Sequence, residues 1–501
     1  MINISFINVT IPPALNETLY ILNKTREGPV TISNAPPIPQ WIQDMFLLFY
    51  SVLLLLAILL MSHYIYYARH VKELVWDPPS NSSTPLSIII PVKNENVEVI
   101  KNAVERLRGL VCENSEIVIV SDDPPEAFEK IKKALEGLPN VKILRRPSPS
   151  GYKGTALNWA VEYAGGDVLL FLDVDSIPPV DICQRARSVG EREILFMGWD
   201  GYTPIKTPVG LIQLFLYKYL LYYVAIIGRH NTKHPVFALG SGIAIRKKFL
   251  KELGGFCNCT ADDYDISFKT YLHGGRVAYA PGPPVYVEVP AGYTAFKKQY
   301  ARWTYNSAYL LALYFTKIWK LKMPLVYKLS IFLNIATHPL MILTTLATMA
   351  AGVAMGYMGI LLPPLYILLL QSILFAIALI HTYYVYKLAR RDGYRFWSVA
   401  GLLAKSTALL ITLSPYLSFY VLLGILRRRI RWLVTPKGVS ALMGGAWGLY
   451  EISTVAVLGS LLAAAVYSGN YIFVTNILFL LTVFLYTYLR VAIPSSQLGR
   501  G

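Results

Sequence analysis

The chain alternates between long apolar runs and one stretch in which short apolar segments are separated by polar ones. Residues 44–67 form the first long run, which is long enough to cross the ~30 Å hydrocarbon core of a bilayer as a helix. The later runs lie at about 326–353, 358–386, 398–424, 447–467 and 470–490. The pattern therefore predicts a bundle of membrane helices interrupted by one large polar insertion.

The insertion, residues 85–296, has the pattern of an α/β domain. The short β-branched runs LSIIIPV, EIVIVSDD, VKILRR and DVLLFLDVDS predict strands. Helical patterns at 95–111, 124–137 and 154–164 lie between these runs. Alternation of strands and helices favours a mostly parallel, Rossmann-like sheet. The predicted fold class is an α/β domain inserted in an α-helical transmembrane bundle.

Basic residues beside the apolar runs set the expected topology. Arg69, His70 and Lys72 follow the first run, which indicates that this end faces the cytoplasm. The clusters KLARRDGYR (387–395) and LRRRIR (426–431) are also expected on the cytoplasmic side.

The apolar run between these two clusters is predicted to lie along the membrane surface. A single crossing would place the two clusters on opposite sides. The run also contains Lys405, Pro415 and several Ser and Thr residues. Residues 397–424 are therefore assigned as an interfacial or re-entrant helix. Five spans remain: one at 44–67, two within 324–386 and two within 447–490.

The first 43 residues are polar and contain several prolines, and we expect them to form an extracytoplasmic tail. Four Asn-x-Ser/Thr sequons occur in this tail, at Asn3, Asn8, Asn16 and Asn23. A tail outside the membrane agrees with an inward-facing end for the first run.

The composition supports a membrane protein and argues against nucleic-acid binding. Of 501 residues, 54% are hydrophobic and only 15% are charged, which is too apolar for an ordinary soluble protein. The net charge is +17, and in membrane proteins Lys and Arg collect in cytoplasmic loops beside the anionic leaflet. We therefore expect a multi-pass cell-membrane protein whose insertion is cytoplasmic and whose partner is the lipid bilayer, not nucleic acid.

The most informative polar residues end the strand predicted at DVLLFLDVDS. Asp173 and Asp175 are two positions apart, so their side chains project to the same face of an extended strand. The carboxyl ends of parallel strands border the crevice where α/β folds bind ligands. Two carboxylates there suit a divalent cation that bridges a diphosphate. A solvated polar strand end would show the same two residues.

Other predicted strand ends carry polar residues that would gather at the same edge. SIIIPVKNE ends with Lys93 and Glu95, VIVSDD contains Asp122, and GYKGTALNWA places Lys153 before a helix. Each residue alone is explained as a solvated surface side chain. Their order along the chain predicts a nucleotide-diphosphate pocket.

The segment TADDYDIS supplies candidate catalytic acids. Asp262, Asp263 and Asp265 are consistent with the first turn of a helix, where acids stabilise the helix dipole. The functional alternative is a general base, because a carboxylate held beside a hydroxyl can accept its proton as that hydroxyl reacts.

The order PVKNE, SDD, KGTALN, DVD, GSG, ADDYD, QYARW resembles processive family-2 glycosyltransferases, which include cellulose, hyaluronan and chitin synthases. The resemblance runs from about 85 to 306. It resumes within the region 425–446 at WLVTPKG, which looks like the gating loop of cellulose synthases with Trp432 in place of Phe. It implies a GT-A domain, a UDP-sugar donor, Mg²⁺ or Mn²⁺, a growing polysaccharide as acceptor, and translocation of the product.

On the donor side, the resemblance implies a set of nucleotide and metal contacts. The UDP group would contact Lys93, Glu95, Asp122, Lys153, Asp173, Thr435 and Lys437. Asp173 and Asp175 match the family's DxD motif and would hold the metal, with Asp175 as the principal ligand. PVKNE replaces the common PTYNE and SDD replaces DDG, which leaves the identity of the donor open.

On the acceptor side, the resemblance implies the catalytic residues. Asp263 matches the catalytic base, and Asp262 stands beside it where Glu is common. Gln299, Arg302 and Trp303 match the QxxRW motif, in which Arg neighbours the leaving diphosphate and Trp borders the acceptor terminus. The acceptor would also contact Gly240, Ser241 and Gly242.

The segment FKKQYARWTYN combines this motif with the residues of a membrane-surface belt. The spacing of the QxxRW residues puts them on one side of a helix. Lys297, Lys298 and Tyr305 are expected to anchor that helix at the membrane surface. Residues 297–323 are therefore predicted as interfacial helices that join the active site to the bundle.

Two alternatives to a polysaccharide synthase remain open. A non-processive lipid-linked transferase resembling dolichyl-phosphate sugar synthases would share the GT-A fold and DxD, but typically lacks QxxRW and the gating motif. A transporter or receptor with a degenerate transferase domain would not need the carboxylates, all of which are present. The sugar and any accessory subunits are left open.

Overall fold

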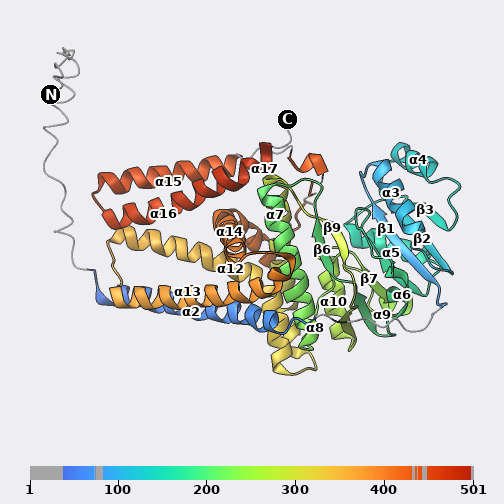
Figure 1. Cartoon of the computed structure of the whole chain (residues 1–501), viewed down its shortest axis with the longest axis horizontal. Helices are drawn as coiled ribbons and strands as arrows, with labels where there is room; N and C mark the ends of the chain where they lie inside the picture. Colours follow the sequence, from blue (N-terminus) through green and yellow to red (C-terminus); the bar gives the residue numbers. More distant parts are fainter. Residues whose placement is uncertain are drawn as a thin grey trace, which may run out of the picture.

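A sheet domain and a helix bundle lie side by side in the computed structural model (Figure 1). The structure describes residues 38–72, 74, 83–431, 435–436, 438–442 and 448–497. The chain runs through the bundle in α2 (Gln40–Arg69), builds the sheet domain, and returns through α11 (Tyr293–Lys320). The four sequons, Trp432 and Lys437 lie outside the described residues.

The sheet domain is built on a seven-stranded sheet in the order β3-β2-β1-β4-β7-β5-β8. Its strands are β1 (Leu86–Val92), β2 (Ser115–Ser121), β3 (Val141–Arg145), β4 (Val168–Phe171), β5 (Glu193–Phe196), β7 (Ile243–Arg246) and β8 (Arg276–Tyr279). Strand β7 runs antiparallel to both of its neighbours, and the other pairs are parallel. Strand β1 is buried along almost its whole length, because a central parallel strand is covered on both faces. The prediction of a mostly parallel α/β sheet is confirmed.

Six helices cover the sheet. They are α3 (Val97–Arg108), α4 (Pro125–Ala134), α5 (Lys153–Tyr163), α6 (Ile182–Arg187), α9 (Lys247–Glu252) and α10 (Asp262–Leu272). The first three match the helical patterns predicted from the sequence. The start of α3 is fixed by Asn96, whose side-chain oxygen accepts the N–H of Glu98 at 2.9 Å. A separate two-stranded sheet pairs β6 (Trp199–Tyr202) with β9 (Val285–Glu288).

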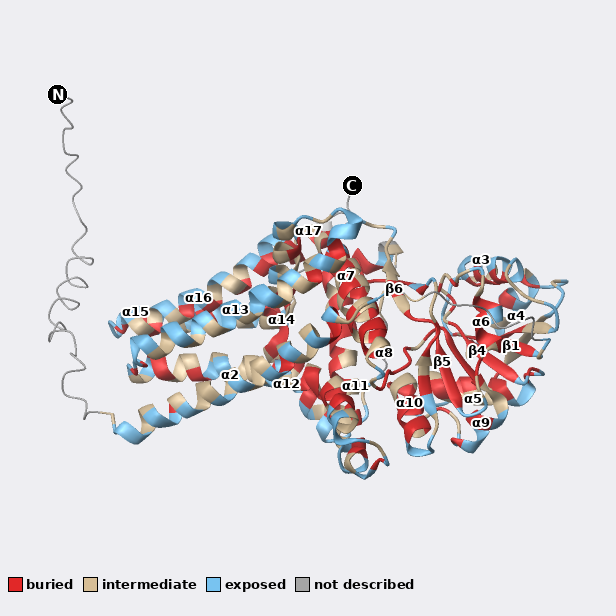
Figure 2. Ribbon diagram, turned by 60° about the horizontal axis from the view of Figure 1, so that its bottom comes forward, coloured by how far each residue is buried: buried red, intermediate tan, exposed pale blue. Residues whose placement is uncertain are grey.

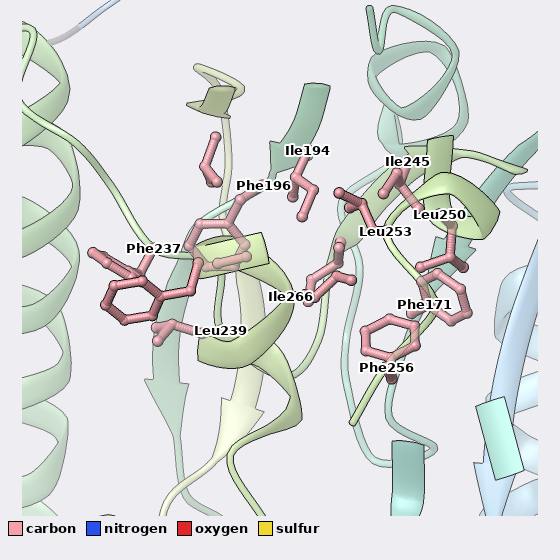
Figure 3. Packing of buried hydrophobic residues seen from close by; sticks show 14 of the residues in the cluster. Phe171, Ile194, Phe196, Phe237, Leu239, Ile245, Leu250, Leu253, Phe256 and Ile266 are labelled. Atoms are coloured by element: carbon pink, nitrogen blue, oxygen red, sulfur yellow. The ribbon is translucent and has the colours of Figure 1, made fainter. Parts of the chain in front are cut away.

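The core of the sheet domain continues into the helices beside it. Buried residues follow the strands in Figure 2, and Figure 3 shows Phe171 packed edge-on against Phe256, with ring centroids 4.9 Å apart. The same buried cluster includes Tyr314 of α11 and Ile331 and Ile335 of α12 (Leu325–Met358). The position of α11 is therefore set by the core of the sheet domain as well as by the bundle.

Seven helices of the described part of the chain are long and apolar enough to cross a membrane. Five of them match the predicted spans: α2, α12, α13 (Pro364–Ala389), α15 (Leu449–Tyr467) and α16 (Tyr471–Thr487). Short helical elements connect or extend these helices. Element η3 (Arg390–Asp392) follows α13, and η4 (Gly438–Leu442) precedes α15. Elements η5 (Tyr488–Ala492) and α17 (Pro494–Gln497) follow α16. The bundle thus has the apolar helices of a multi-pass membrane protein.

A long helix within the insertion was not expected from the sequence. It comprises α7 (Pro208–Phe215), the π-helix η2 (Leu216–Gly228) and α8 (Arg229–Asn231). In the most apolar 18-residue stretch of this helix, 56% is buried inside the protein, compared with 11% in the corresponding stretch of α2. Protein rather than lipid therefore covers much of this helix. Tyr217 packs in the core of the sheet domain, whereas Tyr219 packs against the ends of α13 and α14. This helix separates the sheet from the bundle (Figure 1).

The remaining apolar helix, α14 (Phe396–Ile425), is the one assigned to the membrane surface. Near its start, Val399 packs with Phe215 of α7. Near its end, Gly424 lies directly against the backbone of Tyr305 in α11. Both ends therefore contact helices that border the sheet domain, which agrees with an interfacial course. The assignment itself stays a prediction.

Candidate active site

The turn after β4 carries Asp173 and Asp175 at the carboxyl end of the parallel strands. The backbone N–H of Asp173 donates to the Ser241 hydroxyl at 3.0 Å, and the hydroxyls of Ser241 and Ser176 are 2.7 Å apart. Ser241 is fully buried, so its hydroxyl holds the acidic turn against the loop before β7. Gly242 has a φ of +81°, a conformation that favours glycine. The predicted acceptor contacts of this loop stay predictions.

Lys153, at the start of α5, reaches the same turn. Its Nζ lies 2.5 Å from Asp173 Oδ1 and donates to the carbonyl of Gly240 at 2.8 Å. Burial disfavours the charged amine, but the carboxylates of Asp173 and Asp262 raise the pKa of Lys153 overall. A Cβ on Gly240 would lie 3.6 Å from Asp263 Oδ2 and 3.7 Å from Lys153 Nζ. The structure therefore brings the lysine, the acidic turn and the second acid pair together.

The second acid pair opens α10. Burial, followed by the charge of Asp262, raises the pKa of Asp263 to about 7, and burial also raises the pKa of Asp262. A carboxyl with a pKa near neutrality can exchange protons efficiently at physiological pH. The helix-start explanation is confirmed for all three acids, because Asp262, Asp263 and Asp265 lie in the first turn of α10. Asp265 is also occupied elsewhere, since it accepts the Tyr314 hydroxyl at 2.6 Å and pairs with Lys269 at 2.8 Å.

Helix α11 carries Arg302 beside this acidic cluster and Gln299 beside Tyr217. The helix is tied to the segment before α10, because the side-chain amide of Asn306 donates to the Thr260 carbonyl at 2.9 Å. Burial lowers the pKa of Arg302, an effect opposed by the nearby carboxylates of Asp173, Asp263 and Asp262. Arg302 is thus the second cation beside the acidic residues. Gln299 is buried and contacts Tyr217.

Trp303 lies where the sheet domain meets the bundle. Its ring centroid is 5.9 Å from that of Tyr217 and 5.5 Å from that of Tyr300. It packs against buried clusters of both regions. Sequence reasoning missed Tyr217, because nothing in its apolar run distinguishes it from the neighbouring tyrosines.

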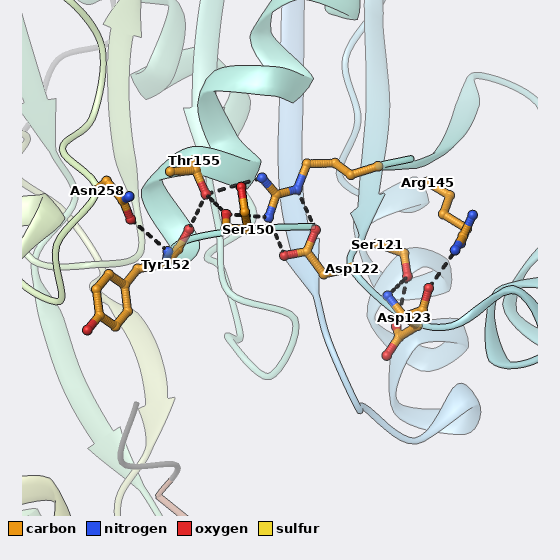
Figure 4. A network of polar contacts seen from close by, with 9 residues as sticks. Ser121, Asp122, Asp123, Arg145, Ser150, Tyr152, Thr155 and Asn258 are labelled. Carbon is orange, nitrogen blue, oxygen red and sulfur yellow. Dashed lines mark hydrogen bonds and ion pairs between the residues drawn. The ribbon is translucent and has the colours of Figure 1, made fainter. Parts of the chain in front are cut away.

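Asp122 is bound by an arginine that sequence reasoning also missed. Arg146 Nε and Nη2 each lie 2.5 Å from one of the carboxylate oxygens of Asp122, a bidentate pair. The same guanidinium donates to the Thr155 hydroxyl and to the Ser150 carbonyl, both at 3.2 Å, and Figure 4 shows Asp122 beside these residues. The available signal was the Arg-Arg pair that ends VKILRR at the carboxyl end of β3.

The ends of β1 and β2 are joined by the neighbouring acid. Asp123 accepts the backbone N–H of Asn94 at 2.6 Å and the hydroxyl of Ser121 at 2.8 Å. Lys93 and Glu95 flank Asn94 and are exposed at this edge of the sheet. The predicted strand ends therefore do meet at one edge, and the nucleotide contacts assigned to Lys93, Glu95 and Asp122 stay predictions.

The structure contradicts part of the predicted membrane-surface belt. Lys297 Nζ lies 2.6 Å from Glu451 Oε1, inside the protein, and the buried Tyr305 donates its hydroxyl to the Arg428 carbonyl at 2.9 Å. Lys298 is half-exposed. Local sequence could not reveal that partners about 150 and 120 residues away draw two of the three side chains inward.

Little of the predicted gating loop is described. Thr435 is half-buried, and among the described residues its hydroxyl has no hydrogen-bond partner. Lys437 lies outside the described residues. The backbone N–H of Gly438 donates to the carboxylate of Glu288 in β9, which attaches the end of this loop to the sheet domain. The donor contacts predicted for Thr435 and Lys437 stay predictions.

Asp173 and Asp175 are the residues that fit a divalent cation. Carboxylate oxygens are hard ligands, and Mg²⁺ is usually held by one or two carboxylates, with phosphates and water completing its shell. No group of three or more His, Cys, Asp or Glu residues able to hold a metal occurs in the described part of the chain. The donor set therefore suits a cation that arrives with a diphosphate better than a site enclosed by protein.

The chain is similar to several known proteins. A probable glycosyltransferase of Sulfolobus acidocaldarius is 28% identical over 432 residues, which cover 81% of this chain and 89% of that protein. The poly-beta-1,6-N-acetyl-D-glucosamine synthase of Staphylococcus aureus is 25% identical over 273 residues, or 52% of this chain and 64% of its own length. Among solved structures, the mannosyltransferase PcManGT from Pyrobaculum calidifontis, in complex with GDP-Man and Mn²⁺, is 17% identical with a TM-score of 0.49 and covers 76% of this chain and 99% of its own.

The family match covers the acidic turn, α10, α11 and much of the bundle. Residues 168–423, just over half of the chain, match the family described as Glycosyl transferase family group 2. The chain belongs to this family, and its sheet domain is a GT-A-like glycosyltransferase domain.

Proposed function

We propose that the chain is an inverting transferase that polymerises sugars from a UDP-sugar donor and passes the polysaccharide through its helix bundle. The observation that carries the proposal is the position of Asp263. This half-buried carboxyl, with a pKa of about 7, lies in one cluster with Lys153 and Arg302, on a helix tied to α11. A proton acceptor and two cations are the groups that sugar transfer from a diphosphate requires.

Asp263 acts as the general base in the proposed reaction. Its carboxylate takes the proton of the acceptor hydroxyl while that oxygen attacks the anomeric carbon of the donor. The bond from the anomeric carbon to the diphosphate breaks, and the nucleoside diphosphate leaves with the electron pair. Attack from the face opposite the leaving group inverts the anomeric centre, through a transition state with oxocarbenium character.

Lys153 and Arg302 stabilise the leaving group. Negative charge builds up on the diphosphate oxygen as the glycosidic bond lengthens, and fixed cations in a buried site stabilise that charge strongly. Asp173 and Asp175 would hold Mg²⁺ or Mn²⁺, which when bound neutralises diphosphate charge. The ion pair between Lys153 and Asp173 shows that the lysine can reach this turn.

Trp303 supports the choice of a polymer as acceptor. Its ring packs against both the sheet domain and the bundle, so a sugar held on it would lie between the two. Aromatic faces offer large, rigid surfaces for apolar contact. We place the sheet domain in the cytoplasm and the amino terminus outside, in keeping with the basic clusters at 387–395 and 426–431.

The test supplies isolated membranes with radiolabelled UDP-glucose, UDP-N-acetylglucosamine, UDP-glucuronate or GDP-mannose and sizes the product. Labelled polymer that depends on a UDP-sugar supports the proposal. Label that extracts with lipid as a monosaccharide supports the non-processive, lipid-linked alternative instead. Membranes containing Asp263→Asn protein serve as the control, and equal turnover in these membranes would refute the assignment of the base.

A further inference from the structure

A second buried charge pair lies beside the active-site helix and has no part in the proposed chemistry. Lys297 of α11 and Glu451 of α15 are 2.6 Å apart, and the side chain of Glu451 is fully buried. The second carboxylate oxygen accepts the backbone N–H of Gly448 at 2.9 Å, and the first also lies 3.2 Å from the Tyr293 hydroxyl. Both oxygens of the carboxylate are therefore satisfied.

Three tyrosines surround the ammonium group of this pair. Lys297 Nζ lies 5.7 Å from the ring centroid of Tyr293, 5.4 Å from that of Tyr416 and 5.8 Å from that of Tyr450. These rings come from α11, α14 and α15 in turn. Aromatic faces attract a cation at such distances, and the attraction is greater away from water. Lys297 therefore links its own helix, α11, to both α14 and α15.

The pair lies on the face of α11 opposite the active site. An α-helix turns about 100° per residue, so Lys297 is rotated by about 160° from Gln299 in one direction and by about 140° from Arg302 in the other. Arg302 faces the acidic cluster and Gln299 contacts Tyr217, whereas Lys297 faces α14 and α15. Any shift of α11 that broke the ion pair would also move Gln299 and Arg302.

The start of α11 is confined by close packing at the same end. Gly292 precedes the helix, and a Cβ at this position would collide with the carbonyl oxygen of Ala441 in η4. Tyr293 is fully buried and packs edge-on against Tyr488, with centroids 6.3 Å apart. The ion pair therefore belongs to a junction that fixes both the position and the rotation of the first turns of α11.

Stability alone does not account for a buried ion pair. Replacing such a pair with uncharged residues of similar volume is often neutral or stabilising, because removing two charges from water is costly. What the pair adds is a preference for one arrangement, since any other leaves a buried charge unpaired. Catalysis needs such a preference, because small displacements of catalytic groups lower rates strongly.

We propose that Lys297 and Glu451 are positioning residues that fix α11 against α14 and α15, and so hold Arg302 at the acidic cluster and Gln299 and Trp303 against Tyr217. The proposal rests on the transferase function proposed above. It assigns no contact with donor or acceptor to either residue.

The test compares wild type with the double variant Lys297→Met, Glu451→Gln. This variant removes both charges but keeps side chains of similar volume and an oxygen that can accept the backbone N–H of Gly448. We expect donor KM to stay within about twofold and kcat to fall by about 10- to 100-fold. Amide hydrogen exchange of Tyr293–Trp303 should accelerate by about tenfold, because the first turns of α11 open more often. The single variant Glu451→Gln leaves the charge of Lys297 without its carboxylate and should show changes in the same direction that are at least as large.

The matched control is Lys251→Met, Glu162→Gln. These residues form an ion pair of 2.8 Å on the surface of the sheet domain, with side chains 50% and 61% exposed. Neither kcat nor exchange in α11 should change in this variant.

Two outcomes would overturn the proposal. A folded double variant with kcat within about twofold of wild type would show that the arrangement does not need the pair. Unchanged exchange in α11 would overturn it whatever the activity. If the double variant does not fold, Glu451→Gln decides by the same criteria. If wild type transfers no sugar from any donor, the proposed function fails, while the exchange data still decide whether the pair holds α11.

Discussion

Two groups of charged residues lie on opposite faces of α11, and they differ in how their charges are balanced. On one face, the acidic cluster faces two cations, Lys153 and Arg302. Its four carboxyl groups belong to Asp173, Asp175, Asp262 and Asp263. On the other face, Lys297 and Glu451 balance each other, and both carboxylate oxygens are hydrogen-bonded.

The difference indicates what each group does. Desolvation and then the neighbouring charge of Asp262 raise the pKa of Asp263, and the excess negative charge of the cluster favours a bound cation. Such a site is poised to bind and to exchange protons. A balanced pair with every partner present gains nothing from a ligand and instead prefers one geometry. The same residue types thus support chemistry on one face of α11 and position on the other.

The largest expected effect is the loss of the base. Asp263→Asn should lower sugar transfer by about 10²- to 10⁴-fold, the usual contribution of a general base. Binding of UDP should persist, because Lys153 and Arg302 are retained. Turnover and equilibrium binding of UDP measure the two quantities. Asp167→Asn, the same change at an exposed position, is the control and should leave both unchanged. If the Asp263 variant retained turnover, Asp263 would not be the base, and the acidic face of α11 could no longer be distinguished from the other face by its role in chemistry.

Removal of divalent cations tests the excess charge directly. We expect a chelator to lower turnover by roughly 10²-fold, because the metal supplies several kcal/mol of charge stabilisation in such sites. Added Mg²⁺ or Mn²⁺ should restore turnover. Asp175→Asn should raise the cation concentration that is needed for half-maximal turnover. Exchange at the Lys297–Glu451 junction should not respond to the chelator. Full activity in excess chelator would contradict a metal role for Asp173 and Asp175.

The pH dependence of turnover tests a smaller effect, the influence of Asp262 on the pKa of Asp263. Because Asp263 must be ionised to accept a proton, turnover should rise with pH through about 7. Asp262→Asn removes the neighbouring charge that raises the pKa of Asp263, so the midpoint of this rise should move down by about one pH unit. A pH profile of kcat measures the midpoint. A midpoint that stays near pH 7 in the variant would show that burial alone sets it.

Stability should respond to pH in the opposite direction. The pKa of Asp263 is raised from 3.8 to about 7 in the folded protein, so the folded protein keeps this proton where the unfolded chain has lost it. The contribution of this group to the free energy of unfolding is therefore fully present below about pH 4 and is lost as pH rises to about 7. Asp263→Asn should flatten this part of the stability profile in thermal unfolding experiments.

Sequence and structure agree where the information is local and differ where it is not. Strand ends, the DxD turn and Lys153 follow from short patterns, because β-strand alternation and a parallel sheet place them at one edge. Arg146 and Glu451 escaped notice, because their roles depend on partners 24 and 154 residues away. Lys297 was misassigned for the same reason, since a basic residue in an aromatic segment is also typical of a membrane surface.

The smallest expected effect comes from the exposed ion pair of Lys251 and Glu162, which has the same residue types as the buried pair but remains in water. Solvent screens its attraction, and ordering two long side chains offsets much of the gain. Lys251→Met, Glu162→Gln should therefore leave the thermal midpoint within about 2 °C of wild type. Lys297→Met alone should lower the midpoint much more, because Glu451 would stay buried and unpaired. Differential scanning fluorimetry in detergent compares the two variants. Equal shifts would mean that burial does not distinguish these pairs, and the contrast between the two faces of α11 would then rest on catalysis alone.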